Sequence, residues 1–200
     1  MKIAFRPFLL ILGWQASLSI HIVSAQSSDY LAPRDAWGNP NINGIWQAMG
    51  TAHWDLETHE SRAGPMWQLG AIGAIPGGVG VVEGDEIPYT TAGLAKKQEN
   101  QANWLELDPV VRCYMPGIPR ANYMPYPFQI LHNNDALFFS YEYAGAVRDV
   151  HLSNPGPAPI DSWMGQSWAE WDDDTLVIHT DGFNGQTWLD RAGNFHSDLL

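Results

Sequence analysis

Between Pro125 and Thr180, short apolar and aromatic segments follow one another and are separated by turn residues. β-branched and aromatic residues that alternate with polar ones indicate strands, and clusters of Asn and Asp between them, such as Asn133–Asp135, indicate tight turns. We therefore predict an antiparallel meander here. Its strands are expected at residues 128–132, 137–143, 147–152, 166–171 and 175–180.

Side-chain alternation gives each predicted strand two faces. The odd-numbered residues of 137–143 are all apolar or aromatic and share one side. On the next strand, Arg148 lies on the same side as Val150 and Leu152. An arginine on an apolar face needs an anionic partner. Two interpretations stay open: an ion pair with a carboxylate on a neighbouring strand, or a contact with a bound anion.

Three segments before the meander complete the predicted elements. A first strand is expected at Ile45–Gln47, with Trp46 closing one end of the sheet. Residues 64–80 are apolar and uncharged, so we expect them to pack over the sheet, either as a fixed cover or as a lid. Apolar residues at helical spacing predict one helix from Thr90 to Leu105.

Composition supports a β-rich fold. The chain has ten Trp, 19 Gly and 14 Pro, which favour sheets, turns and loops over helices. We predict a single domain over residues 26–200, built on an antiparallel, barrel-like or strongly curved sheet of about seven to eight strands. The last residues, Phe195–Leu200, resemble the start of another strand, so the chain is expected to be truncated there.

The first 25 residues have the pattern of a secretory signal peptide. Lys2 and Arg6 precede an apolar run, and small residues lead up to a cleavage site after Ala25. The purely apolar run is too short for a stable membrane span, which needs about 20 residues. The sequence thus predicts a periplasmic or secreted protein with no membrane anchor after cleavage.

Charge narrows the range of partners. The chain carries a net charge of −12, which becomes −14 when Lys2 and Arg6 are removed with the signal peptide. Such an acidic protein would repel nucleic acid, so we expect no nucleic-acid partner. Cys113 is the only cysteine, which excludes an internal disulfide; we expect its side chain to be a small buried apolar group.

Candidate metal ligands have unsuitable spacing. His53 and His59 are six residues apart, which puts them on different faces of a helix, so we interpret residues 51–62 as a solvated polar loop. Asp172–Asp174 lacks the spacing of a calcium loop and is more typical of a hairpin turn. We predict neither a metal nor a cofactor.

The loop after the last predicted strand is the richest in polar chemistry. Residues 182–194 lead to His196 and contain Asn184, Trp188 and Asp190. Loops on a rigid sheet are common places for binding and catalysis. A histidine beside a carboxylate can act as a general base near neutral pH. His196 is therefore the leading candidate for a functional residue.

Several motifs, at Met124–Ile130, Ser162–Gly165, Trp171–Val177, Thr187–Asp190 and His196–Ser197, together resemble those of a family of exported bacterial proteins for which no reaction is established. Members of that family continue past Leu200, which also implies truncation. The family pattern has a histidine where this chain has Gln166. The spacing of strands and turns in the meander is also similar to that of lipocalin-like (calycin) barrels, which is an analogy of fold alone.

Two functions are compatible with these patterns. The first is an exported protein whose aromatic-lined cavity binds a small apolar or aromatic molecule. The second is a lyase, isomerase or hydrolase that uses His196 with Asp190 or Tyr141 as acid and base. An incomplete sheet would also leave an open edge, through which a homodimer could form. The expected ligand-binding residues are Arg148, Glu142, Tyr143, Trp168, Trp188 and Asn184.

Overall fold

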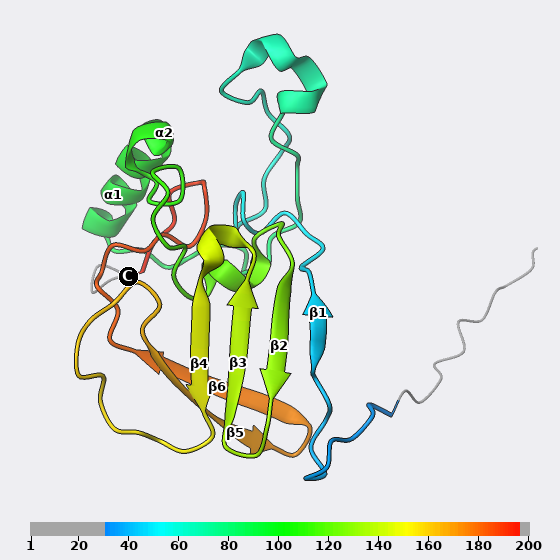
Figure 1. Cartoon of the computed structure of the whole chain (residues 1–200). Coiled ribbons are helices and arrows are strands. Elements are labelled where there is room, and N and C mark those ends of the chain that lie inside the picture. Colours follow the sequence, from blue (N-terminus) through cyan, green and yellow to red (C-terminus); the bar gives the residue numbers. More distant parts are fainter. Residues whose placement is uncertain (1–30, 197–200) are drawn as a thin grey trace, which may run out of the picture. The chain divides into compact units, whose positions relative to one another are not determined.

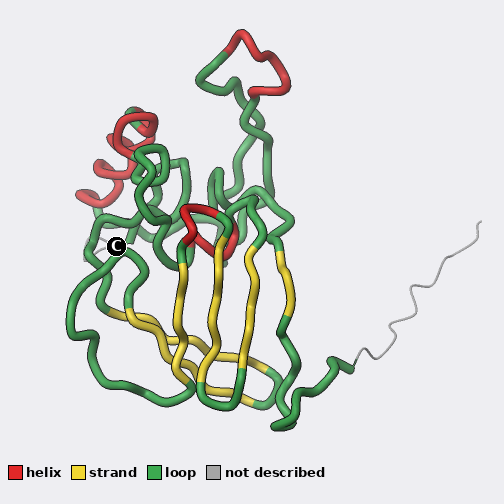
Figure 2. Tube along the Cα trace, in the orientation of Figure 1, coloured by secondary structure: helices red, strands yellow, loops and turns green. Residues whose placement is uncertain are grey.

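The structure is a computed structural model that describes residues 31–196. The predicted signal peptide and residues 197–200 lie outside the described residues. The strands and helices described below all belong to one compact unit that begins at Pro33. The strands form a six-stranded sheet in the order β1 to β6, and a few short helices accompany it (Figures 1 and 2). The prediction of a mostly β fold is confirmed.

The strands lie close to their predicted positions. The sheet runs from β1 (Gly44–Trp46) through β2 (Phe128–His132), β3 (Ala136–Tyr141), β4 (Val147–His151) and β5 (Gln166–Asp172) to β6 (Thr175–Asp181).

One pairing differs from the predicted meander. Neighbours from β1 to β4 are antiparallel, as are β5 and β6, but β4 and β5 are parallel. After the long loop at residues 152–165, the start of β5 lies beside the end of β4 and runs in the same direction, with Val150 paired to Ser167 and His151 to Trp168. A parallel neighbour requires such a crossover.

The sheet is curved and open. In Figure 1, β5 and β6 turn away and pass behind β2–β4. Within the described residues, β1 and β6 are the two edges and do not pair with each other, so the described sheet is not closed into a barrel. It has six strands rather than seven or eight.

The core follows the predicted alternation. Leu137, Phe139 and Tyr141 of β3 are buried, and Val150 of β4 lies directly opposite Leu137 in the strand register. Both members of that pair are fully inaccessible to solvent. β3 nevertheless ends at Tyr141, because a short 3-10 turn, η3 (Tyr143–Gly145), follows. Its Ala144 has a φ of 58°, which is incompatible with a continuing strand.

The predicted helix is confirmed, with an interruption. α1 (Thr91–Ala102) begins after Thr90, whose side chain accepts a hydrogen bond from the backbone N–H of Gly93, as an N-cap does. Asn103 then departs from helical geometry, and α2 (Trp104–Leu107) follows. No helix in residues 31–196 is long and apolar enough to cross a membrane.

The apolar segment 64–80 does not cover the sheet. It forms an arm that projects away from the strands and carries the 3-10 segment η1 (Trp67–Gly73) at its tip (Figure 1). Ile72 is 94% exposed, whereas Ile75, lower on the arm, is buried. The two predicted roles of this segment, a fixed cover over the sheet and a lid, are therefore both wrong. Backbone pairing of His59 with Gly78 and of Arg62 with Ile75 holds the two sides of the arm together, which hydrophobicity alone does not reveal.

Two further side-chain predictions are corrected. Trp46 is about half exposed and donates its indole N–H to the carbonyl of Ile42, so it does not plug the end of the sheet. Cys113 is exposed and occupies a turn, with a φ of 65° and a hydrogen bond from its backbone N–H to the carbonyl of Val110. It is not a buried apolar group.

Replacing Ile72 by alanine should change the free energy of unfolding by no more than about 0.5 kcal/mol, because an exposed side chain loses little packing. The matched change Ile75→Ala should cost about 2 kcal/mol, since it empties a buried site. Urea denaturation of both variants measures the difference. Equal costs would show that the tip of the arm packs against the protein in solution.

Candidate functional site

Two hollows lie on either side of the segment that contains Thr187–Leu189 and Phe195–His196, where Trp188 and Phe195 form an isolated antiparallel bridge. Each has a volume of about 570 Å³. We name them the Arg148 hollow and the Trp188 hollow. The Arg148 hollow has an apolar wall that includes Ile118, Leu176, Ile178, Phe183 and Leu189. Its polar side chains are Asn122, Arg148, Thr180 and His196.

Arg148 is buried, and the part of the chain that the structure describes supplies no counter-ion for it. Its side chain donates from Nε to Ser167 Oγ at 2.8 Å and from Nη2 to Thr180 Oγ1 at 2.7 Å. Its guanidinium also lies 5.7 Å from the centre of the Phe139 ring. Among residues 31–196, no carboxylate comes within ion-pair distance of it. The predicted ion pair with a neighbouring strand is therefore wrong.

The surroundings of Arg148 are unfavourable for its charge. The residue is only 5% exposed, and burial lowers the pKa of its guanidinium. The nearby Tyr141 partly opposes that effect. Hydroxyl groups satisfy donors but cannot neutralise a charge, and a buried charge without an opposite partner is costly. The site is thus suited to an anion that arrives from outside the protein.

Tyr141 and Asn122 extend this polar group. The Tyr141 hydroxyl donates to Asn122 Oδ1 at 2.7 Å, and Asn122 lines the hollow. Burial raises the pKa of Tyr141, while the positive charge of Arg148 lowers it in part. Asn122 comes from η2 (Arg120–Tyr123), a segment with no strand or helix signal in the sequence. For that reason, sequence reasoning missed it.

His196 lines the same hollow as Arg148. Burial lowers the pKa of its imidazole, which favours the neutral form at neutral pH. Its Nε2 shares a hydrogen bond of 3.0 Å with Thr187 Oγ1. The ring also packs edge-on against Phe183, with centres 5.1 Å apart. The structure therefore brings Arg148 and His196 to one cavity.

Asp190 does not join His196. Its carboxylate accepts hydrogen bonds from the backbone N–H groups of Leu56, Ala192 and Asn194, and from Asn194 Nδ2. Burial raises its pKa to about 6, although the donors from Asn194 and Leu56 oppose the rise. Asp190 organises the loop before His196, and within residues 31–196 no ion pair joins the two.

The remaining predicted site residues lie elsewhere. Glu142 is exposed, and Tyr143 donates its hydroxyl to the carbonyl of Val110. Trp168 stacks on His179, its cross-strand neighbour, with ring centres 4.1 Å apart. None of these three side chains lines either hollow.

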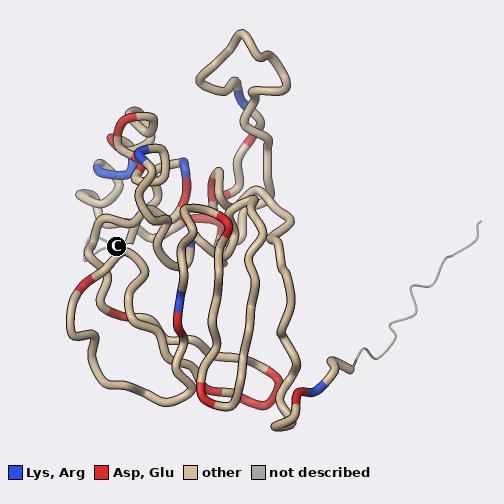
Figure 3. Tube along the Cα trace, in the orientation of Figure 1, with Lys and Arg blue, Asp and Glu red and all other residues tan. Residues whose placement is uncertain are grey.

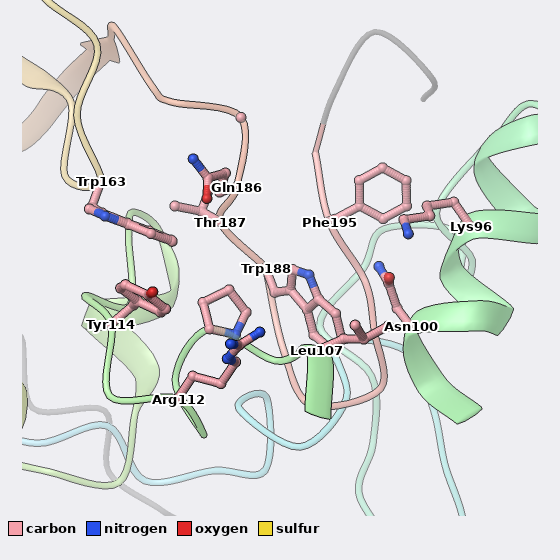
Figure 4. Close-up of a pocket in the computed structure, with 12 residues that line it drawn as sticks. Lys96, Asn100, Leu107, Arg112, Tyr114, Trp163, Gln186, Thr187, Trp188 and Phe195 are labelled. Atoms are coloured by element: carbon pink, nitrogen blue, oxygen red, sulfur yellow. The ribbon is translucent and has the colours of Figure 1, made fainter. Parts of the chain in front are cut away.

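The side chain of Asn184 also contributes to a turn rather than to a hollow, because its Oδ1 accepts the N–H of Gln186. Trp188 lines the other hollow, together with Lys96, Arg112, Tyr114, Trp163 and Phe195 (Figure 4). These residues come from segments far apart in the chain, so no local motif indicates their meeting.

The described residues contain no cluster of three or more His, Cys, Asp or Glu that could hold a metal ion. A scan against family models, a search of curated proteins and a search of solved structures each found no match for this chain.

Proposed function

We propose that this is an exported binding protein that holds a small apolar or aromatic carboxylate in the Arg148 hollow. The observation that carries the proposal is the buried guanidinium of Arg148, which borders an apolar wall and, among residues 31–196, has hydroxyl partners but no carboxylate. The pattern of the first 25 residues supports export.

The chemistry of the hollow suits such a ligand. A guanidinium has five N–H donors in a planar fork that matches a carboxylate. Neutral His196 and the amide of Asn122 add polar contacts close to the charge. The hydrocarbon part of the ligand would lie against Leu176, Ile178 and neighbouring apolar side chains. A volume of about 570 Å³ is within the usual range for small-molecule sites.

The test compares benzoate with its neutral analogue benzamide by isothermal titration calorimetry. Benzoate should bind more tightly, and Arg148→Met should weaken benzoate binding by about 10- to 100-fold while leaving benzamide unchanged. A charged hydrogen bond worth about 1.5–3 kcal/mol gives this range. Arg34→Met serves as the matched control, because Arg34 lies in an exposed ion pair away from the hollow.

Equal affinities for benzoate and benzamide in the wild type would contradict the proposal. So would an Arg148→Met variant that keeps a wild-type circular dichroism spectrum and still binds benzoate as before. Tryptophan fluorescence and thermal unfolding of each variant separate a loss of binding from a loss of folding.

An enzyme with His196 as its general base has less support. Asp190 uses its carboxylate within its own loop. The Tyr141 hydroxyl donates to Asn122, and the raised pKa of Tyr141 disfavours its use as a base near neutral pH. Neither of the partners expected for His196 is therefore available to it in this arrangement.

A further inference from the structure

The Trp188 hollow has an aromatic wall on one side and a stacked pair on the other. Trp188 and Phe195 are nearly buried and come from the bridged segments beside α1. Opposite them, Tyr114 and Trp163 stack with ring centres 5.1 Å apart and planes inclined by 16°. Figure 4 shows these rings around one opening. Aromatic side chains around one opening favour planar aromatic ligands, because aromatic rings prefer offset-stacked or edge-to-face contacts.

Among the described residues, both charged side chains that line this hollow are basic. Lys96 comes from α1 and Arg112 from the turn after α2, and no Asp or Glu is among the lining residues. Figure 3 shows basic and acidic positions together on α1, α2 and the loops beside them, so the basic character belongs to the lining of the hollow and not to the whole region. The chain as a whole has a net charge of −12. A basic opening on an acidic protein selects for anions locally, since nearby charges dominate over distant, screened ones.

The guanidinium donors of Arg112 have no partner among the described residues. In the described part of the chain, its guanidinium takes part in no hydrogen bond or ion pair, whereas its backbone N–H bonds to the carbonyl groups of Asp108 and Pro109. The turn thus fixes the backbone position of Arg112, while its guanidinium has no ion-pair partner among the described residues. Lys96 has a contact with Glu99 at 3.0 Å, but both side chains are largely exposed, so that pair is weak and can be exchanged.

We propose that the Trp188 hollow is a second ligand site, specific for planar aromatic anions. The ring system of the ligand packs between Trp188 and the Tyr114–Trp163 pair, and its acidic group meets Arg112 and Lys96. This site is separate from the Arg148 hollow, because the hydrogen-bonded side chains of Thr187 and His196 face different hollows. The two sites can therefore be tested independently.

The probe is 1-naphthoate, compared with two analogues of the same ring system, neutral 1-naphthylmethanol and cationic 1-naphthylmethylammonium. Binding is followed by calorimetry with the full chain and, in parallel, with its Arg148→Met variant, which removes the anion-binding group of the Arg148 hollow. We expect 1-naphthoate to bind most tightly and the ammonium compound least. Arg112→Gln should weaken naphthoate binding by about five- to tenfold and leave the alcohol unchanged.

Two variants serve as controls. Arg62→Gln removes the same charge from an exposed residue that lines neither hollow and should leave binding unchanged. Trp188→Leu should weaken all three probes, because it removes the common aromatic surface. Since Arg112 is exposed, its replacement is not expected to affect folding, and thermal unfolding checks this.

The outcomes separate the two proposals. Loss of naphthoate binding in Arg112→Gln but not in Arg148→Met supports the second site. Loss in Arg148→Met alone overturns the second site and leaves the Arg148 hollow as the site. Equal binding of the anionic and cationic probes, or unchanged affinity in Arg112→Gln, also overturns it.

Discussion

Replacing Arg120 by methionine is expected to lower the free energy of unfolding by about 3–5 kcal/mol, the usual cost of removing one partner of a buried ion pair. Arg120 bonds to both carboxylate oxygens of Asp108, at 2.7 and 2.8 Å, and both side chains are almost completely buried. The variant leaves Asp108 buried and without its counter-ion. Urea denaturation followed by tryptophan fluorescence measures the change.

The exposed pair between Arg34 and Asp174 provides a matched control, because it has the same two-oxygen geometry at 2.6 and 2.8 Å. Arg34→Met should cost no more than about 1 kcal/mol, since solvent screens exposed pairs. The double variant Arg120→Met/Asp108→Leu should recover part of the loss by removing the orphaned charge. A cost for Arg120→Met as small as that of Arg34→Met would contradict the argument.

The Arg120–Asp108 pair also matters for the proposed site. Arg120 begins η2, and two residues later the same segment supplies Asn122 to the Arg148 hollow. Asp108 additionally accepts the backbone N–H of Val110, which lies at the start of the turn that carries Arg112. One buried ion pair thus connects segments that border both hollows. Its loss should weaken ligand binding as well as stability.

The features that the sequence predicts correctly are local ones. Alternation places Leu137, Phe139 and Tyr141 on one face of a strand. That face is buried, as expected for the apolar side of a strand that alternates with polar residues. The start of α1 depends on Thr90 and its nearest neighbours alone. The inward position of Arg148 follows from the same period of two.

The features that the sequence does not predict depend on distant parts of the chain. β5 is parallel to β4 because of where the 152–165 loop delivers it, which strand patterns do not encode. The arm at 64–80 is apolar enough to pack, yet no described surface receives its tip. Asp190 is close to His196 along the chain, but its carboxylate turns toward the backbone of Leu56. The convergence of Arg148 and His196 is likewise a property of the topology.

His53 is a similar case: the polar residues around it predict a solvated loop over residues 51–62, and this is wrong for His53 and Asp55, although residues 58 and 60–62 are exposed. His53 and Asp55 are both buried. The ring of His53 packs against Trp54, with centres 5.0 Å apart, and its backbone carbonyl accepts the N–H of Arg191. Burial, with smaller contributions from the charges of Arg191 and Arg120, lowers the pKa of His53 to about 4.

This lowered pKa predicts acid destabilisation with a defined pH window. In the unfolded chain the imidazole has its ordinary pKa of 6.5, so between pH 6.5 and about 4 the unfolded state binds more protons than the folded state. The stability that neutral His53 contributes is complete above pH 6.5 and is lost as the pH falls through about 4. At about 1.36 kcal/mol per pKa unit, the total loss is about 3 kcal/mol.

The measurement compares the unfolding free energy of the wild type with that of His53→Gln and His53→Phe at several pH values from 7 to 4. Asp190, whose pKa is raised to about 6, gives a slope of the opposite sign, because its folded form holds a proton that the unfolded form releases. That slope is common to all three proteins and cancels in the difference. Between pH 7 and 4, the wild type should therefore lose about 3 kcal/mol more of its unfolding free energy than either variant does. The pH dependence should be the same for His53→Gln and His53→Phe, since neither replacement side chain can be protonated. A difference that stays constant from pH 7 to 4 would mean that His53 reaches solvent in the folded protein.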